Sequence, residues 1–154
     1  MQSLLRLLPW IALFLGGATA VGAQDSSYDD NALRVESRRG NLQIVRGIQD
    51  SVVSRSGVFR GPRVASLVIR SDSALAQAKI FERDFQPGQY LTAIGIATLG
   101  AAIGIWRISD INAAIPTGLT IVSVSLITYG GAKLESAHRA LSRAIWWYNR
   151  DLGK

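Results

Sequence analysis

The sequence predicts a mainly α-helical membrane protein, built as a two-helix transmembrane hairpin with flanking amphipathic helices and a small N-terminal β-meander. Two apolar stretches separated by a short polar connector lie within residues 90–132, which is the pattern of two membrane helices joined by a loop. Residues 33–60 alternate apolar and polar side chains, as half-buried strands do. Residues 1–23 have the three-part layout of a secretory signal. The chain then divides into five segments: 1–23, 24–62, 63–89, 90–132 and 133–154.

Composition narrows the possible classes of protein. The 154 residues are 48% hydrophobic and contain no cysteine, which excludes disulfides, thiolate metal sites, a cysteine nucleophile and a lipidated cysteine. The net charge is +6, and fourteen of the seventeen basic residues are arginine. Arginine suits phosphate and lipid headgroups as well as nucleic acid. We expect membrane lipids and no nucleic acid as partners, because an export signal would carry the basic segments out of the cytoplasm.

The N-terminal segment has the features of a cleaved export signal. A short basic stretch, Met1–Arg6, precedes the apolar run Leu7–Leu15 and the small residues Gly16–Ala23. Cleavage is expected after Ala23. The alternative is an uncleaved membrane anchor, but the apolar run is shorter than the roughly 20 residues that a spanning helix needs.

Three short alternating runs follow the signal. Leu33–Glu36 and Leu42–Val45 are separated by a glycine-containing turn, and a third run occupies Ser51–Arg60. They predict a β-meander of three or four strands that ends at Gly61-Pro62.

The spacing of apolar residues becomes helical after Arg63. Residues 63–86 are predicted to form one broken or two short amphipathic helices, with Ser71 or Ser73 as an N-cap. Pro87-Gly88 is expected to end this part. Its polar face is interpreted as solvated, next to a headgroup layer.

The first membrane helix is assigned to Leu91–Trp106, which carries no charge and would span about 24 Å. Tyr90 and Trp106 lie at its ends as predicted interface anchors. Three glycines are predicted to let helix backbones pack closely. We expect this packing to involve the second helix of the same chain, with a homodimer as the alternative. The three are Gly95, Gly100 and Gly104.

A connector at Arg107–Gly118 is expected to lead into the second membrane helix, Leu119–Tyr129, with Gly130-Gly131 marking its far end. Neither helix contains Asp, Glu, Lys or His. Transport pathways and proton relays usually need such residues inside the membrane, so their absence argues against a transporter.

The C-terminal segment, Lys133–Asp151, is predicted to be a basic amphipathic helix. It is expected either to lie in the membrane interface or to pack on the helical segment at 63–86. The predicted interface contacts are Arg139, Arg143, Trp146 and Trp147. Residues 133–154 hold five Lys/Arg and the connector holds one, so the positive-inside rule favours a cytoplasmic tail. The export signal favours the opposite side, and we follow the signal.

No catalytic, cofactor or metal site is predicted. Glu135 and His138 form an i, i+3 pair on one helical face, but no further ligands accompany the only histidine. We therefore expect a protein that is not an enzyme and binds no cofactor.

The order of segments resembles that of a type of small bacterial envelope protein, which has an export signal, a glycine-rich membrane hairpin and a helix ending in an A-x-x-x-Y-N motif. The matching pieces are Leu75–Ala78, Tyr90–Gly104 and Ala144–Asn149. This type offers no assigned activity or functional residues, so the resemblance implies architecture and location only.

The predicted function is that of an accessory or scaffolding subunit of a larger membrane complex in the bacterial inner membrane, with its soluble parts on the periplasmic side. A membrane-protein partner or self-association through the glycine-rich helix is expected. The alternatives are a lipid-binding or membrane-remodelling hairpin protein, and a small homo-oligomeric pore or transport accessory.

Overall fold

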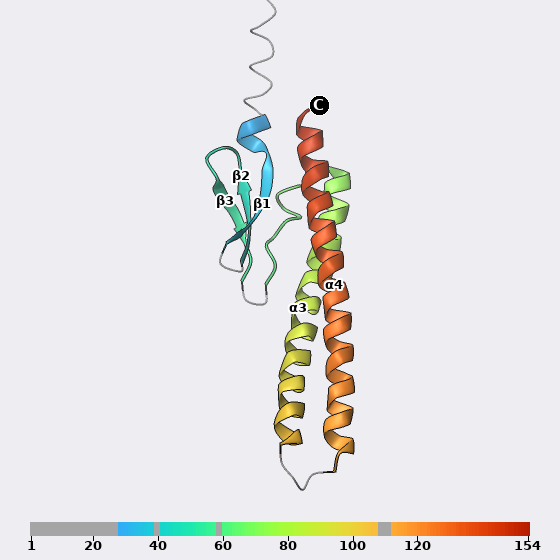
Figure 1. The fold of residues 1–154 in the computed structure, drawn as a ribbon. Coiled ribbons are helices and arrows are strands. Elements are labelled where there is room, and N and C mark those ends of the chain that lie inside the picture. The colour runs from blue at the N-terminus through green and yellow to red at the C-terminus, as the bar shows by residue number, and fades with distance from the viewer. Residues whose placement is uncertain (1–27, 39–40, 58–59, 108–111) are drawn as a thin grey trace, which may run out of the picture.

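The computed structural model describes residues 28–38, 41–57, 60–107 and 112–154, and the predicted export signal lies outside these residues. Two long helices pack side by side, and a small sheet lies beside one half of the pair (Figure 1). The chain is therefore mainly helical with a three-stranded N-terminal sheet. The elements are β1 (Leu33–Arg38), β2 (Asn41–Arg46), β3 (Ser51–Arg55), α3 (Asp72–Trp106) and α4 (Ala114–Leu152).

The sheet is an antiparallel meander in the order β1-β2-β3. Val35 pairs with Ile44, and Val45 pairs with Val52 across an irregularity in the β2 register. The predicted meander is confirmed with three strands. The stretch expected to run to Arg60 ends its strand at residue 55, and an isolated bridge pairs Gly57 with Arg60.

Helix α3 begins at a capped position. Ser71 has extended backbone geometry, and its hydroxyl accepts a hydrogen bond from the backbone N–H of Ala74 at 3.3 Å. The same hydroxyl donates to a carboxylate oxygen of Asp151 at 2.6 Å, which joins the start of α3 to the end of α4. The sequence predicted either Ser71 or Ser73 as the N-cap, and the structure shows Ser71 in this role.

The prediction that Pro87-Gly88 ends this helix is wrong. Helix α3 continues without a break to Trp106. Proline removes the N–H that would bond to the carbonyl of Arg83, and its ring crowds that carbonyl, but Pro87 lies on the exposed side of the helix. Packing against α4 on both sides of this position keeps the helix continuous.

Helix α4 is also unbroken, so Gly130-Gly131 does not end it, and no separate C-terminal helix begins at residue 133. It starts at Ala114, five residues before the predicted Leu119. The side-chain oxygen of Asn112 accepts from the N–H of Ala114 at 2.9 Å, which satisfies one of the free N–H groups at this end. Pro116 falls in the first turn, where its missing N–H costs nothing.

The two helices meet along a seven-residue repeat of mostly small residues. A repeat of seven corresponds to 3.5 residues per turn, the geometry in which two helices keep one seam by a left-handed twist. Small side chains along the seam allow the backbones to approach closely. The buried residues of this repeat are Phe81, Gly88, Gly95 and Ala102 in α3, and Pro116, Ser123, Gly130, Ala137 and Ala144 in α4.

The hydrophobic core lies at the sheet end of the helix pair, so the C-terminal part of α4 packs on the first half of α3, one of the two predicted arrangements. Asn149 attaches the sheet to α4. Its side-chain oxygen accepts from the backbone N–H of Leu33, and its amide donates to the Leu33 carbonyl, both at 2.8 Å. The edge strand β1 thereby bonds to α4 through one asparagine.

Candidate functional site

The half of the hairpin away from the sheet is apolar and uncovered. We call residues 90–106 of α3 and 114–132 of α4 the apolar leg. Ten of the sixteen exposed large apolar side chains among the described residues lie on it, from Tyr90 to Tyr129. Both helices are long and apolar enough to cross a membrane, and only 17% of the most apolar window of each is buried. A core helix of a soluble protein would bury most of that surface.

The length of the leg matches a bilayer. Residues 85–106 of α3 contain no charged residue, and 22 helical residues rise about 33 Å. Residues 114–132 of α4 are also free of charge and rise about 28 Å. The hydrocarbon core of a bilayer is about 30 Å thick.

Glycines lie where the two helices of the leg approach closely, and Gly95 is one of the three glycines that we expected there. A Cβ atom built on Gly95 would lie 2.7 Å from a side-chain carbon of Ile127 and 3.0 Å from its backbone nitrogen. A Cβ atom on Gly130 would lie 2.7 Å from the backbone nitrogen of Thr92. By contrast, Gly100 and Gly104 have no atom within 4 Å of an added Cβ atom, so they do not contact the second helix and face outward instead.

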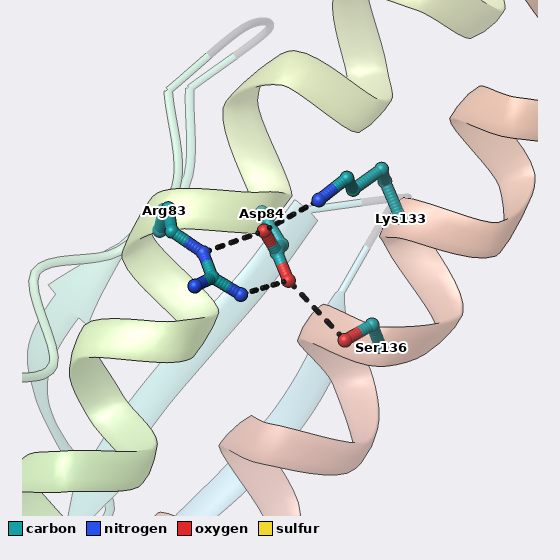
Figure 2. Close-up of polar contacts among 4 residues, drawn as sticks. All are labelled: Arg83, Asp84, Lys133 and Ser136. Atoms are coloured by element: carbon teal, nitrogen blue, oxygen red, sulfur yellow. Dashed lines mark hydrogen bonds and ion pairs between the residues drawn. The ribbon is translucent and has the colours of Figure 1, made fainter.

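A group of polar side chains surrounds the helix pair where the leg begins. We call Arg83, Asp84, Lys133 and Ser136 the polar collar. The carboxylate of Asp84 is 3% exposed and accepts from the Arg83 guanidinium at 2.9 and 3.1 Å, from Lys133 Nζ at 3.1 Å and from the Ser136 hydroxyl at 3.2 Å (Figure 2). The collar thus ties α3 to α4 through charge-assisted hydrogen bonds.

These partners favour the ionised carboxylate. The hydrogen bonds from Arg83 are the main cause that lowers the pKa of Asp84 from the usual 3.8 to about 2, and Lys133 acts in the same direction. Burial of the carboxyl opposes this change. From the sequence, the Glu82-x-Asp84 carboxylates are interpreted as solvated, whereas the structure buries Asp84. Asp84 and Lys133 are the charged residues that border the two uncharged runs on the sheet side.

The predicted interface residues lie at different heights along the hairpin. Tyr90 and Trp106 are exposed at the two ends of the α3 part of the leg. Arg139 and Arg143 are exposed on α4, roughly 9 and 15 Å beyond Lys133 by helical rise. Their contact with a membrane interface stays a prediction.

The tryptophans lie farther along α4, about 20 Å from the polar collar. The rings of Trp146 and Trp147 pack edge to face at 4.9 Å, and the guanidinium of Arg150 lies 3.8 Å from the Trp147 ring centre. These contacts stabilise the end of α4. Contact of the two tryptophans with a membrane interface also stays a prediction.

A pocket of about 450 Å³ lies between the sheet and the start of the leg, and nothing in the sequence pattern indicated it. Its lining includes Asn41 at the start of β2, Gln89 on α3 and His138 on α4. The buried side-chain oxygens of Gln89 and Thr92 have no hydrogen-bond partner among the described residues. Buried polar atoms of this kind are rare, and these two lie at the sheet end of the leg.

The Glu135 and His138 pair does not form a metal site in the structure. Glu135 instead bonds to Arg139 at 2.9 Å, and the His138 ring contacts Phe85 edge to face at 6.0 Å. In the part of the chain that the structure describes, no group of three or more His, Asp or Glu residues is placed to hold a metal ion. The described geometry therefore offers an exposed apolar surface rather than a set of ligands.

The chain was compared with known proteins. No family model matches it, and neither a curated protein nor a solved structure matches it. The resemblance to small bacterial envelope proteins therefore stays a prediction from the order of segments.

Proposed function

We propose that this chain is a non-enzymatic integral membrane protein of the bacterial cell envelope that serves as an accessory or scaffolding subunit of a larger membrane complex. The observation that carries the proposal is the apolar leg, which is exposed, uncharged and bordered by the polar collar. Exposed apolar surface of this extent is typical of a site that contacts a membrane or another protein.

The length of the leg favours crossing over shallow insertion. A hairpin that lies in one leaflet needs about half of the bilayer core, whereas the uncharged runs rise about 28 and 33 Å. Arg107 follows the α3 run at the connector, where it reaches the far headgroup layer. This argument ranks a spanning hairpin above the lipid-binding or membrane-remodelling alternative.

Both ends of the hairpin return to the same side. The sheet and the C-terminus lie at the end of the helix pair opposite the connector (Figure 1). The soluble parts therefore share one face of the membrane. With a cleaved export signal, that face is the periplasmic side of the inner membrane.

The outward glycines provide a surface for a partner. Gly100 and Gly104 face away from α4, with the exposed side chains of Ile96 and Ile103 on the same helix. Small residues four apart allow a second membrane helix to approach closely. In this proposal, a helix of the larger complex, or of a second copy, packs here.

The first experiment identifies the partner. The protein is purified from its native membrane in mild detergent, and the proteins that accompany it are identified together with the mature N-terminus. Stoichiometric partners that are lost with Gly100→Leu and retained with Gly118→Leu support the proposal. Gly118 is an equally open position on α4, so it controls for added bulk. A chain that arrives alone contradicts the accessory role.

The second experiment tests the topology. The chain has no cysteine, so single cysteines at Asn112 and Ser142 can be labelled without background. A membrane-impermeant maleimide applied to intact spheroplasts should label Ser142→Cys and leave Asn112→Cys unlabelled. Labelling of both positions would show that the hairpin enters without crossing. Labelling of the connector alone would place the soluble parts in the cytoplasm.

A further inference from the structure

Three arginines surround one cavity beside the sheet. Arg55 at the end of β3, together with Arg60 and Arg63 in the segment that follows, lines a cavity of about 340 Å³. All three side chains are exposed, and none forms an ion pair with a carboxylate of the described residues. Three unpaired guanidinium groups around one cavity produce a locally positive potential.

The remaining lining suits a small polar group with an apolar attachment. Val53 and Leu67 supply apolar surface continuous with the core, and Ser54 and Ser66 supply hydroxyl groups. The carboxylate of Glu82 lines an adjoining cavity together with Arg60 and Arg63. Its Oε1 atom accepts hydrogen bonds from the backbone N–H groups of Val64 and Ala65 at 2.9 and 3.0 Å. These bonds partly compensate the negative charge of the carboxylate.

The position of this cavity along the hairpin is fixed by two contacts. A Cβ atom on Gly61 would lie 2.8 Å from the Phe85 ring, which shows that the arginine-bearing segment lies directly against α3 at that point. The bonds to Glu82 attach the same segment one turn away. Phe85 is the first residue of the uncharged α3 run. The cavity that the three arginines line therefore lies at the height where the uncharged α3 run begins.

We propose that Arg55, Arg60 and Arg63 form a binding site for the phosphate of an anionic phospholipid headgroup in the leaflet next to the sheet. Guanidinium groups bind phosphate oxygens in pairs of parallel hydrogen bonds. Basic residues next to a membrane segment are attracted by anionic lipids. The inference rests on the proposed membrane insertion and adds the class of lipid that the chain selects.

The test uses the full chain purified in dodecyl maltoside. The midpoint of thermal unfolding is followed while dioctanoyl phosphatidylglycerol, dioctanoyl phosphatidylcholine or inorganic phosphate is added, since a ligand of the folded state raises this midpoint. We expect phosphatidylglycerol to raise it and the other two compounds to have little effect. Arg60→Gln should weaken the apparent affinity about fivefold, the value of one basic residue near a membrane surface.

Arg70→Gln is the matched control. It removes the same charge from an exposed position before α3, about 20 Å of helix from Asp84. It should leave the affinity for phosphatidylglycerol unchanged. The unfolding midpoint of Arg60→Gln without lipid should equal that of the wild type, because its side chain is exposed and unpaired.

Three results would overturn the inference. Equal stabilisation by inorganic phosphate would mean a site for a free anion. Equal stabilisation by phosphatidylcholine would mean no selection for anionic lipid. An equal loss of affinity for phosphatidylglycerol in Arg60→Gln and Arg70→Gln would mean a diffuse effect of charge and no defined site. The cysteine labelling described above tests membrane crossing separately, so failure of insertion and failure of the lipid site give different results.

Discussion

The contact between Gly130 of α4 and the opposite helix gives the sharpest test of the seam. A Cβ atom at this position would lie 2.5 Å from the Thr92 hydroxyl, 2.7 Å from the Thr92 backbone nitrogen and 2.9 Å from the Gly88 carbonyl. The last two are backbone atoms, which no rotamer change can move. Gly130→Ala therefore forces the two helices apart.

The neighbouring glycine supplies the control. Gly131 has no atom within 4 Å of an added Cβ atom. Both substitutions gain about 1 kcal/mol of helix propensity, the usual value for replacing glycine by alanine. Their difference in unfolding free energy therefore isolates the cost of overpacking, which is about 1–3 kcal/mol. We expect the upper end of this range, because the clash involves backbone atoms.

Reversible unfolding in mixed dodecyl maltoside and SDS micelles, followed by far-UV circular dichroism, measures this difference. Gly131→Ala should be as stable as the wild type or more stable. Gly130→Ala should be less stable than Gly131→Ala by about 2–3 kcal/mol. Equal stability of the two variants would refute the seam, because it would mean that Gly130 faces open space.

Three further predictions concern other contacts of the hairpin. Gly95→Ala should destabilise relative to Gly100→Ala in the same assay, since only the first meets backbone atoms of α4. Asn149→Ala should cost about 1–3 kcal/mol, measured by thermal unfolding, because the buried N–H of Leu33 loses its acceptor. The lowered pKa of Asp84 means that its stabilising effect is complete above pH 4 or so and is lost as the pH falls toward about 2. When Asp84→Asn is titrated with acid, it should therefore not show the loss of stability that the wild type shows as the pH falls from about 4 to about 2. At neutral pH the variant should be less stable than the wild type by about 2 kcal/mol.

The strands and the apolar stretches could be predicted because their signal is local. Alternation of side chains indicated three strands, and a continuous uncharged run indicated each helix of the leg. The helix boundaries at Pro87 and Gly130 could not be predicted in this way. Both positions carry residues that often end helices, but here tertiary packing along the seam outweighs the local preference.

The packing of the glycines shows the same limit of local sequence patterns. A GxxxG spacing identifies one face of a helix, and it does not say which neighbour lies on that face. The seam follows seven-residue spacing instead, from Gly88 through Gly95 to Ala102 on α3. A search of the sequence for small residues that recur every seven positions would have found this seam. The attachment of Asn149 to Leu33 joins residues 116 apart, so no local pattern contains it.

The continuity of α3 across Pro87 has a mechanical consequence. Thirty-five helical residues form a rod of about 52 Å, and the sheet is fastened to the end of the hairpin that the proposed insertion leaves outside the bilayer. In that arrangement one end of α3 lies in the membrane and the other end lies outside it, so the helix acts as a lever. Membrane helices tilt when the bilayer becomes thinner, and a tilt of about 10° would move the far end of this rod by about 9 Å. The thickness of the surrounding bilayer would in this way set the height and angle at which the sheet meets whatever lies above the membrane.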